Sequence, residues 1–71
     1  MMKRTTDELT QLADSSLAEA LNWLTAARVQ EEKDAQRLAT VGDFASHKRC
    51  LLIACHIGLV KMQINQAREM L

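Results

Sequence analysis

The sequence predicts an all-α protein, an antiparallel two-helix hairpin that forms a single domain over residues 1–71. Pro is absent and Gly occurs only twice, while Ala, Leu, Gln, Glu, Lys and Arg are abundant, a composition that favours helices over strands. Apolar residues recur at spacings of three and four along two long segments, which is the period of a helix with an apolar face. One short break, near residues 40–43, separates the segments, and such a short loop leaves two long helices as antiparallel neighbours.

The first helix is expected to begin near Thr6. Residues 5–8, TTDE, have the form of a capping box, in which the Thr5 hydroxyl and the Glu8 carboxylate satisfy free backbone N–H groups. The residues that then share one apolar arc, with Trp23 at its edge, are Leu9, Ala13, Leu17, Ala20, Leu21, Leu24, Ala27, Ala35 and Leu38. Residues 30–37, QEEKDAQR, are polar all round but contain no helix breaker, so we expect them to form a solvated end of the hairpin.

The break and the start of the second helix are predicted from two neighbouring residues. Gly42 can leave helical dihedral angles, and Asp43 can cap the helix that follows. The second helix is expected from about Phe44 to Met70. Gly58 inside it costs about 1 kcal/mol relative to Ala unless another backbone passes close to it, which hints at tight packing.

The second helix carries two apolar stripes rather than one. The first consists of Cys50, Ile53, Ile57, Val60, Ile64, Ala67 and Leu71, and the second, roughly opposite, of Leu51, Leu52, Cys55, Leu59 and Met62. An ordinary surface helix needs only one stripe. We expect the first stripe to form the core of the hairpin with Leu17, Leu21, Leu24, Leu38 and Phe44, although both stripes are apolar and either could face inward.

The second stripe is then left for a partner protein or, when the partner is absent, for a second copy of the chain in a four-helix arrangement. Trp23 joins this predicted partner-binding set because Trp is strongly enriched in interface hot spots, although a core position is common for a Trp at such a place. A chain of 71 residues is also near the size below which one core supplies only a few kcal/mol. A second chain is therefore expected.

Charge and cysteine content restrict the compartment and the partners. Nine basic residues balance nine acidic ones, so no overall field draws the chain to nucleic acid or to an anionic membrane. The start, MMKRTTDELT, does not read as a signal peptide, and Cys50 and Cys55 project about 140° apart on a helix, too far for a disulfide. The longest stretch without a charged residue or His is residues 20–27, and residues 50–55 are shorter still, so both fall well short of the roughly 20 residues that span a membrane. A cytoplasmic protein is expected.

Two His and two Cys residues raise the question of a metal site, because they form a ligand set of tetrahedral zinc. Cys55 and His56 are successive residues that point about 100° apart, so one helix cannot close His47, Cys50, Cys55 and His56 around one ion. A dimer that combines two His47/Cys50 pairs stays open as an alternative to cysteines packed in the core. We predict no cofactor, and no enzyme, because the chain has no Gly-rich phosphate loop and no loop to form an oxyanion site.

Two other functions remain as alternatives. A homodimeric bundle could regulate transcription or bind nucleic acid through a sparse basic strip of Lys48, Arg49, Lys61 and Arg68, although aromatic residues for base stacking are few. A small phage- or plasmid-type inhibitor of a host protein would use the same helical surfaces.

Residues 26–57, AARVQEEKDAQRLATVGDFASHKRCLLIACHI, combine a polar, Gln- and Glu-rich helix end, a short loop, a polar residue before an aromatic one, and a segment rich in Leu, Ile and Ala. This pattern resembles the small E-type co-chaperones of type III secretion needle subunits. The residues that match the end of the family's first helix are Ala26, Ala27, Arg28, Gln30 and Leu38, and those that match its second helix are Leu51, Leu52, Ala54 and Ile57. Asp43 and Phe44 stand where the family has a polar residue and Tyr. Phe in place of Tyr, the two His, the two Cys and Trp23 depart from the pattern.

The resemblance implies a function. Members of that family are cytoplasmic helical hairpins that bind a larger tetratricopeptide-like chaperone, and together the two proteins keep the needle subunit soluble and unpolymerised before export. The E-type protein chiefly stabilises the larger chaperone. The chain is therefore expected to be a secretion co-chaperone, with the second stripe on its chaperone partner.

Overall fold

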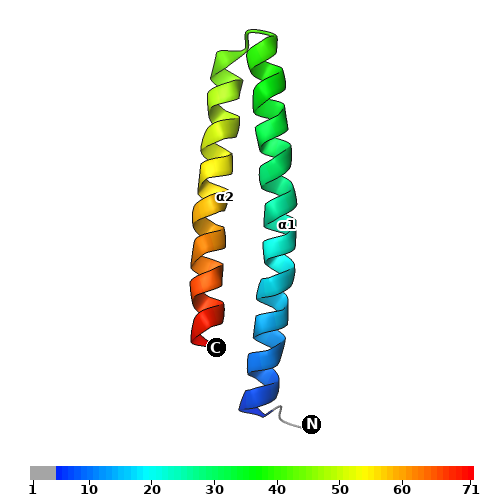
Figure 1. Ribbon diagram of the computed structural model, residues 1–71, viewed down its shortest axis with the longest axis vertical. Helices are drawn as coiled ribbons and strands as arrows, with labels where there is room; N and C mark the ends of the chain where they lie inside the picture. The colour runs from blue at the N-terminus through cyan, green and yellow to red at the C-terminus, as the bar shows by residue number, and fades with distance from the viewer. Residues whose placement is uncertain (1–4) are drawn as a thin grey trace.

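The computed structural model describes residues 5–71 as two long antiparallel helices joined by a tight turn (Figure 1). Helix α1 spans Thr6–Thr40 and helix α2 spans Phe44–Met70. The predicted all-α hairpin is confirmed. Residues 1–4, the start of the segment in which no signal peptide is expected, lie outside the described range.

Both helix starts and the turn follow from local sequence signals. Thr5 Oγ1 accepts a hydrogen bond from the backbone N–H of Glu8 at 3.2 Å, and Asp43 Oδ1 accepts one from Ser46 at 3.2 Å. Gly42 has a φ of 83°, in the left-handed region that favours glycine. The N–H of Asp43 donates to the carbonyl of Leu38 at 2.9 Å and closes the turn. The predicted break is thus confirmed at the residues that predicted it.

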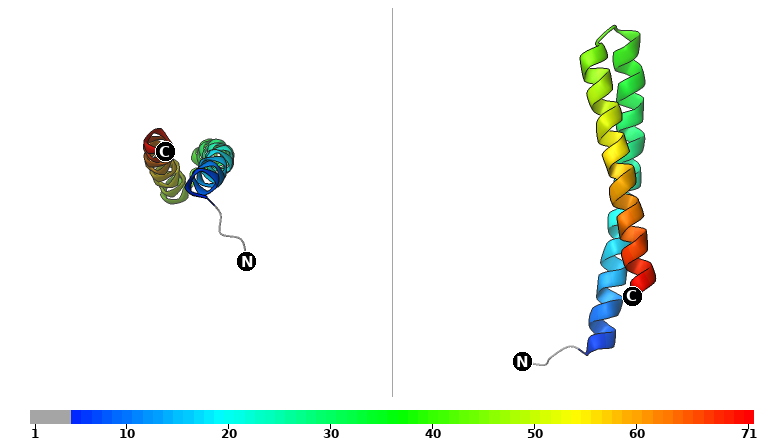
Figure 2. Two further views of the ribbon diagram at one scale, coloured as in Figure 1. Left: turned by 90° about the horizontal axis from the view of Figure 1, so that it is seen from below. Right: turned by 90° about the vertical axis from the view of Figure 1, so that its left-hand side faces the viewer.

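The helices pack side by side along their length, as the end-on and side views of Figure 2 show. Each contributes one row of residues at alternating spacings of three and four, which we call the seam. On α1 the seam consists of Thr10, Asp14, Leu17, Leu21, Leu24, Arg28, Glu31, Ala35 and Leu38, and on α2 with its C-cap residue Leu71 it consists of His47, Cys50, Ala54, Ile57, Lys61, Ile64, Arg68 and Leu71. Most of these residues are half-buried, and Ala35 and Ala54 are buried. The seam is the contact that holds the hairpin closed.

Contacts between the helices fix the register of the seam. Arg68 donates to Asp14 near the open end, and the His47 ring approaches the Ala35 carbonyl near the turn. In that register Leu24 faces Ile57 and Leu17 faces Ile64, and these two layers are apolar on both helices. Each of the remaining layers contains a charged residue, a polar residue or an alanine on at least one of the two helices.

The predicted core is wrong for three of its residues. Ile53 and Val60 are 37% and 42% exposed, and Phe44 is 67% exposed. Ile53 and Val60 lie beside the seam because small Ala54, not its larger neighbours, occupies the contact with α1. Phe44 is the first residue of α2 and lies at the turn, where α1 has ended. The other predicted core residues lie on the seam and are half-buried, namely Leu17, Leu21, Leu24, Leu38, Ile57 and Ile64.

Gly58 lies close to a side chain rather than to the backbone that the sequence suggested. A Cβ atom added there would lie 2.9 Å from Nη1 of Arg28. The glycine therefore gives the Arg28 guanidinium space to cross the surface of α2, while Arg28 Nε donates to Glu32 Oε1 at 3.1 Å.

The hairpin is a rod with little interior. It measures 57 × 22 × 15 Å, and its radius of gyration is 17.0 Å, against about 11 Å for a compact domain of this length. Helix α2 is also long and apolar enough, by length and mean hydropathy alone, to cross a membrane, and only 6% of its most apolar stretch is buried. Most of the apolar surface of α2 is thus outside the hairpin.

Candidate partner-binding surfaces

The side of α2 that points away from α1 carries four apolar residues at helical spacing. Leu52, Cys55, Leu59 and Met62 follow one another at intervals of three, four and three, which places them on one stripe. All four are exposed, Leu52 and Leu59 by 53% and 52%. We call this stripe the outer face. It holds four of the six residues predicted to bind a partner, and the structure leaves each of them accessible.

The remaining two predicted residues lie elsewhere. Leu51 is exposed at the edge of α2 and, together with Val29, Glu32 and Gln36 of α1, lines a shallow groove between the helices. Trp23 lies on α1 and is 71% exposed. The structure therefore does not bring Trp23 and Leu51 together with the outer face, although the sequence placed all six in one set.

The hairpin has two broad sides, one on each flank of the seam, and they differ in charge. The groove of Leu51 and Glu32 marks one of them, which we call the charged side. This side also carries the Arg28–Glu32 ion pair, and Asn65, Arg68 and Glu69 line a hollow with Asp14 near the open end. The opposite broad side carries Ala13, Ala20, Ala27, Ile53, Val60 and Ala67 beside the seam. We call its stretch over residues 13–30 and 53–70 the charge-free side, because no Asp, Glu, Lys or Arg lies there; the same flank carries Asp34, Arg37 and Arg49 beyond this stretch, toward the turn.

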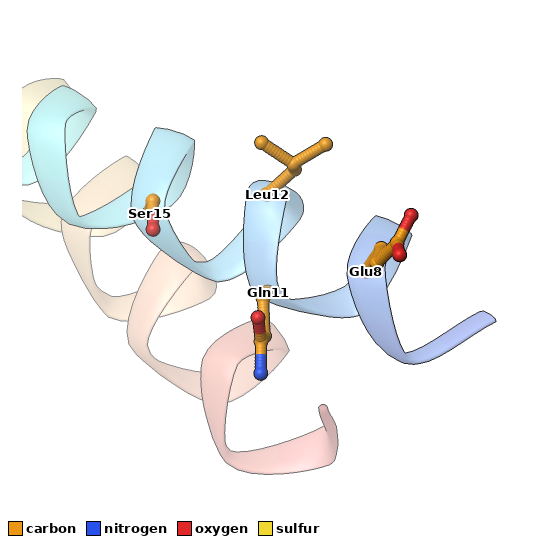
Figure 3. A pocket seen from close by; sticks show the side chains of 4 residues that line it. All are labelled: Glu8, Gln11, Leu12 and Ser15. Atoms are coloured by element: carbon orange, nitrogen blue, oxygen red, sulfur yellow. The ribbon is translucent and has the colours of Figure 1, made fainter. Parts of the chain in front are cut away.

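The hollows described within residues 5–71 are shallow and do not gather a set of chemically active groups. The one drawn in Figure 3 is lined by Glu8, Gln11, Leu12 and Ser15, all from α1, and their side chains point in different directions. A small-molecule site needs a concave pocket with convergent polar groups. The extended apolar stripes are accordingly better candidates for function than any hollow.

The four residues that suggested a metal site lie on different faces. His47 and Cys50 are half-buried on the seam, whereas Cys55 is exposed on the outer face and His56 is exposed about 100° from it, at the rim of the charge-free side. His47 Nδ1 lies 2.7 Å from the carbonyl oxygen of Ala35, so this nitrogen carries the hydrogen in that bond. Within residues 5–71, no group of three His, Cys, Asp or Glu side chains is arranged to hold a metal ion. The His47/Cys50 pair faces α1 rather than a second hairpin.

Cys50 lies opposite two carboxylates across the seam. Burial between the helices raises the pKa of the Cys50 thiol, and a hydrogen bond to Glu31 and the negative charges of Glu31 and Asp34 raise it further, against a smaller opposing effect of Arg49. A thiol with a raised pKa is a poorer nucleophile at neutral pH because less of it is thiolate. Cys50 therefore serves as a small seam residue.

One ion pair joins the helices near the open end. Arg68 Nε donates to Asp14 Oδ1 at 2.8 Å, and Arg68 Nη2 approaches Oδ2 at 3.4 Å. The hydrogen bond from Arg68 lowers the pKa of Asp14, and the same bond raises the pKa of Arg68. Sequence reasoning missed this pair because its partners are 54 positions apart. The signal was the alternating three-and-four spacing, which puts both residues on the seam at equal distances from the turn.

This pairing also changes the predicted basic strip. Arg68 is held by Asp14, Lys61 is half-buried on the seam, and only Lys48 and Arg49 are exposed near the turn. Phosphate backbones are bound by several cations that line up along one surface. The described residues offer no such line on α2.

The comparisons with known proteins add no relative. No protein-family model matches this chain, and neither a curated protein nor a solved structure is similar to it.

Proposed function

We propose that this chain is a small helical binding protein that acts as a co-chaperone, with the outer face of α2 inserted into a groove of a larger partner. The observation that carries the proposal is the exposure of Leu52, Cys55, Leu59 and Met62 on a single stripe with helical spacing. Exposed apolar stripes of this kind are covered by partners in proteins that use a helix-in-groove contact. The groove of the partner would thus bury apolar side chains that the hairpin alone leaves exposed.

The dimensions of the outer face suit a concave partner. Residues 52–62 span about 15 Å of helix, and one helix is about 10 Å wide, so a flat surface would cover only about 150 Å² of it. A groove contacts a helix from several directions and buries more of each side chain. Each large apolar side chain that becomes buried contributes roughly 1.5 to 3 kcal/mol. Helix α1 packs against the opposite side of α2.

The identity of the partner follows from the resemblance of residues 26–57 to E-type co-chaperones. We infer a tetratricopeptide-like chaperone in the cytoplasm, whose concave helical surface provides such a groove. The pair would then keep a type III secretion needle subunit soluble and unpolymerised before export. In this role the chain stabilises the larger chaperone and needs no active site, cofactor, nucleic acid or membrane.

Leu59→Asp tests the contact. The charge would be buried in the groove, and losing one large apolar contact alone corresponds to roughly 10- to 150-fold in Kd. Tagged protein is used to capture partners from its native cytoplasm at high salt, and mass spectrometry identifies what is retained. The expected result is a tetratricopeptide-like chaperone with a small needle-type protein on the unmodified chain, and neither on Leu59→Asp.

Asn65→Asp is the matched control, because Asn65 is exposed on the same helix but lies about 120° from Leu59, on the charged side. This variant should retain the chaperone. Circular dichroism shows whether each variant is still helical. A helical Leu59→Asp variant that captures the chaperone as well as the unmodified chain refutes the assignment of the outer face. Retention of nucleic acid that disappears as salt rises would instead support a nucleic-acid-binding bundle.

A further inference from the structure

We propose that the charge-free side of the hairpin binds a second copy of this chain, so that two hairpins form a four-helix bundle. This contact differs from the proposed chaperone contact, because it uses the flank of the seam instead of the outer face. Its residues beside the seam are Ala13, Ala20 and Ala27 of α1 and Ile53, Val60 and Ala67 of α2.

Composition separates the two broad sides. The charged side holds the Arg28–Glu32 pair and, near the open end, Arg68 and Glu69. Over residues 13–30 and 53–70 the charge-free side has only apolar and uncharged polar positions, with His56 and Gln63 at its rim. Two identical surfaces that meet around a twofold axis bring like charges near one another, so a surface that pairs with itself benefits from having none.

The pattern along each helix also favours a bundle. A helix that packs only against one neighbour needs a narrow apolar stripe, whereas a helix in a bundle core adds an apolar position beside it. Ile53 and Val60 occupy that added position on α2, and Ala20 and Ala27 occupy it on α1. These residues lie beside Leu24 and Ile57 and extend their apolar contact to the surface of the charge-free side.

The areas of the charge-free side and of the outer face indicate which of them a second copy can cover. The charge-free stretch is about 26 Å long, from 17 residue steps, and the hairpin is 22 Å wide, which gives about 570 Å² per chain. Two copies would cover about 1,140 Å², above the roughly 1,000 Å² that a biological interface should clear. The outer face provides only a fraction of this area on a flat surface. A second copy therefore fits the charge-free side, and a grooved partner fits the outer face.

Trp23 lies where such a dimer would need its main anchor. It is 71% exposed on the rim of the charge-free side, next to the layer of Leu24 and Ile57 and midway along the charge-free stretch. Ala20 and Ala27 lie about one turn before and after it, and their small side chains leave room. A twofold axis near this level allows Trp23 of each hairpin to cover the alanines of the other. Central Trp residues are common hot spots.

Adjacent residues of α2 provide the test. Val60→Asp places a charge on the charge-free side, and Leu59→Asp places the same charge about 100° away on the outer face. Sedimentation equilibrium of the full chain at protein concentrations from about 1 to 100 µM measures the dimer Kd. We expect a dimer for the unmodified chain, at least a 100-fold weaker one for Val60→Asp, and little change for Leu59→Asp.

A second pair of variants covers the case in which Val60→Asp does not fold. Ala27→Glu adds a good helix former on the charge-free side, and Ala26→Glu adds it to the neighbouring exposed position away from that side. Only Ala27→Glu should weaken the dimer. A monomeric unmodified chain over the whole range overturns the proposal, and so does a dimer that survives Val60→Asp and Ala27→Glu.

The same variants keep this proposal separate from the chaperone proposal. A helical Val60→Asp chain should be monomeric and still capture the chaperone, while Leu59→Asp should be dimeric and fail to capture it. If Leu59→Asp abolishes the dimer and Val60→Asp does not, the second copy occupies the outer face and the assignment to the charge-free side is wrong.

Discussion

Single residues on the seam decide how the open end of the hairpin stays closed. Asp14 and Arg68 face each other one layer beyond Leu17 and Ile64, and both side chains are partly exposed. Neither residue is apolar, so hydrophobic patterning of the sequence placed Arg68 in a surface strip instead of on the seam. The three-dimensional register, rather than the residue type, gives the pair its role.

The pair predicts a pH dependence. Arg68 lowers the pKa of Asp14 in the folded chain, so the contribution of the pair to stability is present above the unfolded pKa of about 3.9 and disappears as pH falls through the lowered folded value. Asp14→Asn should therefore lower the midpoint of thermal unfolding slightly at pH 7 and lower it less at about pH 2.5, below the unfolded pKa. The difference at pH 7 should shrink at high salt, because both groups are partly exposed. An equal effect of Asp14→Asn at both pH values would mean that the ion pair is not its cause.

The helices themselves could be predicted from sequence, because their signals are local. Thr5, Gly42 and Asp43 fix the helix ends and the turn through contacts within five residues, and these contacts are present. The inner face of α2 could not be predicted in the same way. Leu51, Leu52, Ile53 and Cys55 make its first half apolar nearly all round, so periodicity cannot decide which stripe meets α1. The length of the turn sets the register of the two helices, and this register places Ala54 in the contact with α1.

Gly58 allows a test of packing at the scale of the helix. Gly58→Ala removes the helical cost of glycine, about 1 kcal/mol, and the new Cβ must displace the end of the Arg28 side chain. That guanidinium is exposed and flexible, and its Nε bond to Glu32 can be kept as the tip moves. We expect Gly58→Ala to raise the free energy of unfolding by about 0.5 to 1 kcal/mol, measured by urea denaturation. Destabilisation would show that Arg28 needs the space above Gly58.

At the scale of the whole molecule, the chain places more apolar character outside than inside. The seam contains Arg28, Glu31, Lys61 and the Asp14–Arg68 pair, whereas Leu52, Leu59, Val60 and Trp23 are exposed. Small domains depend on burying apolar surface, and this hairpin buries only two alanines fully within the part that the structure describes. The sequence predicted that a surface would be left over. It could not separate the outer face from the charge-free side, because that distinction depends on where α1 lies.

A hairpin of this kind should gain much of its stability by association. If two copies form the bundle, unfolding separates them, and a tenfold rise in protein concentration stabilises the folded dimer by about 1.4 kcal/mol. For a dimer of this size we expect the midpoint of thermal unfolding to rise by about 3 to 5 °C per tenfold in concentration. Circular dichroism melts over a hundredfold range measure this shift. Val60→Asp should melt at a lower temperature that does not depend on concentration, since its helices lose the second copy while the seam is unchanged. A concentration-independent melt of the unmodified chain would mean that the seam alone stabilises it.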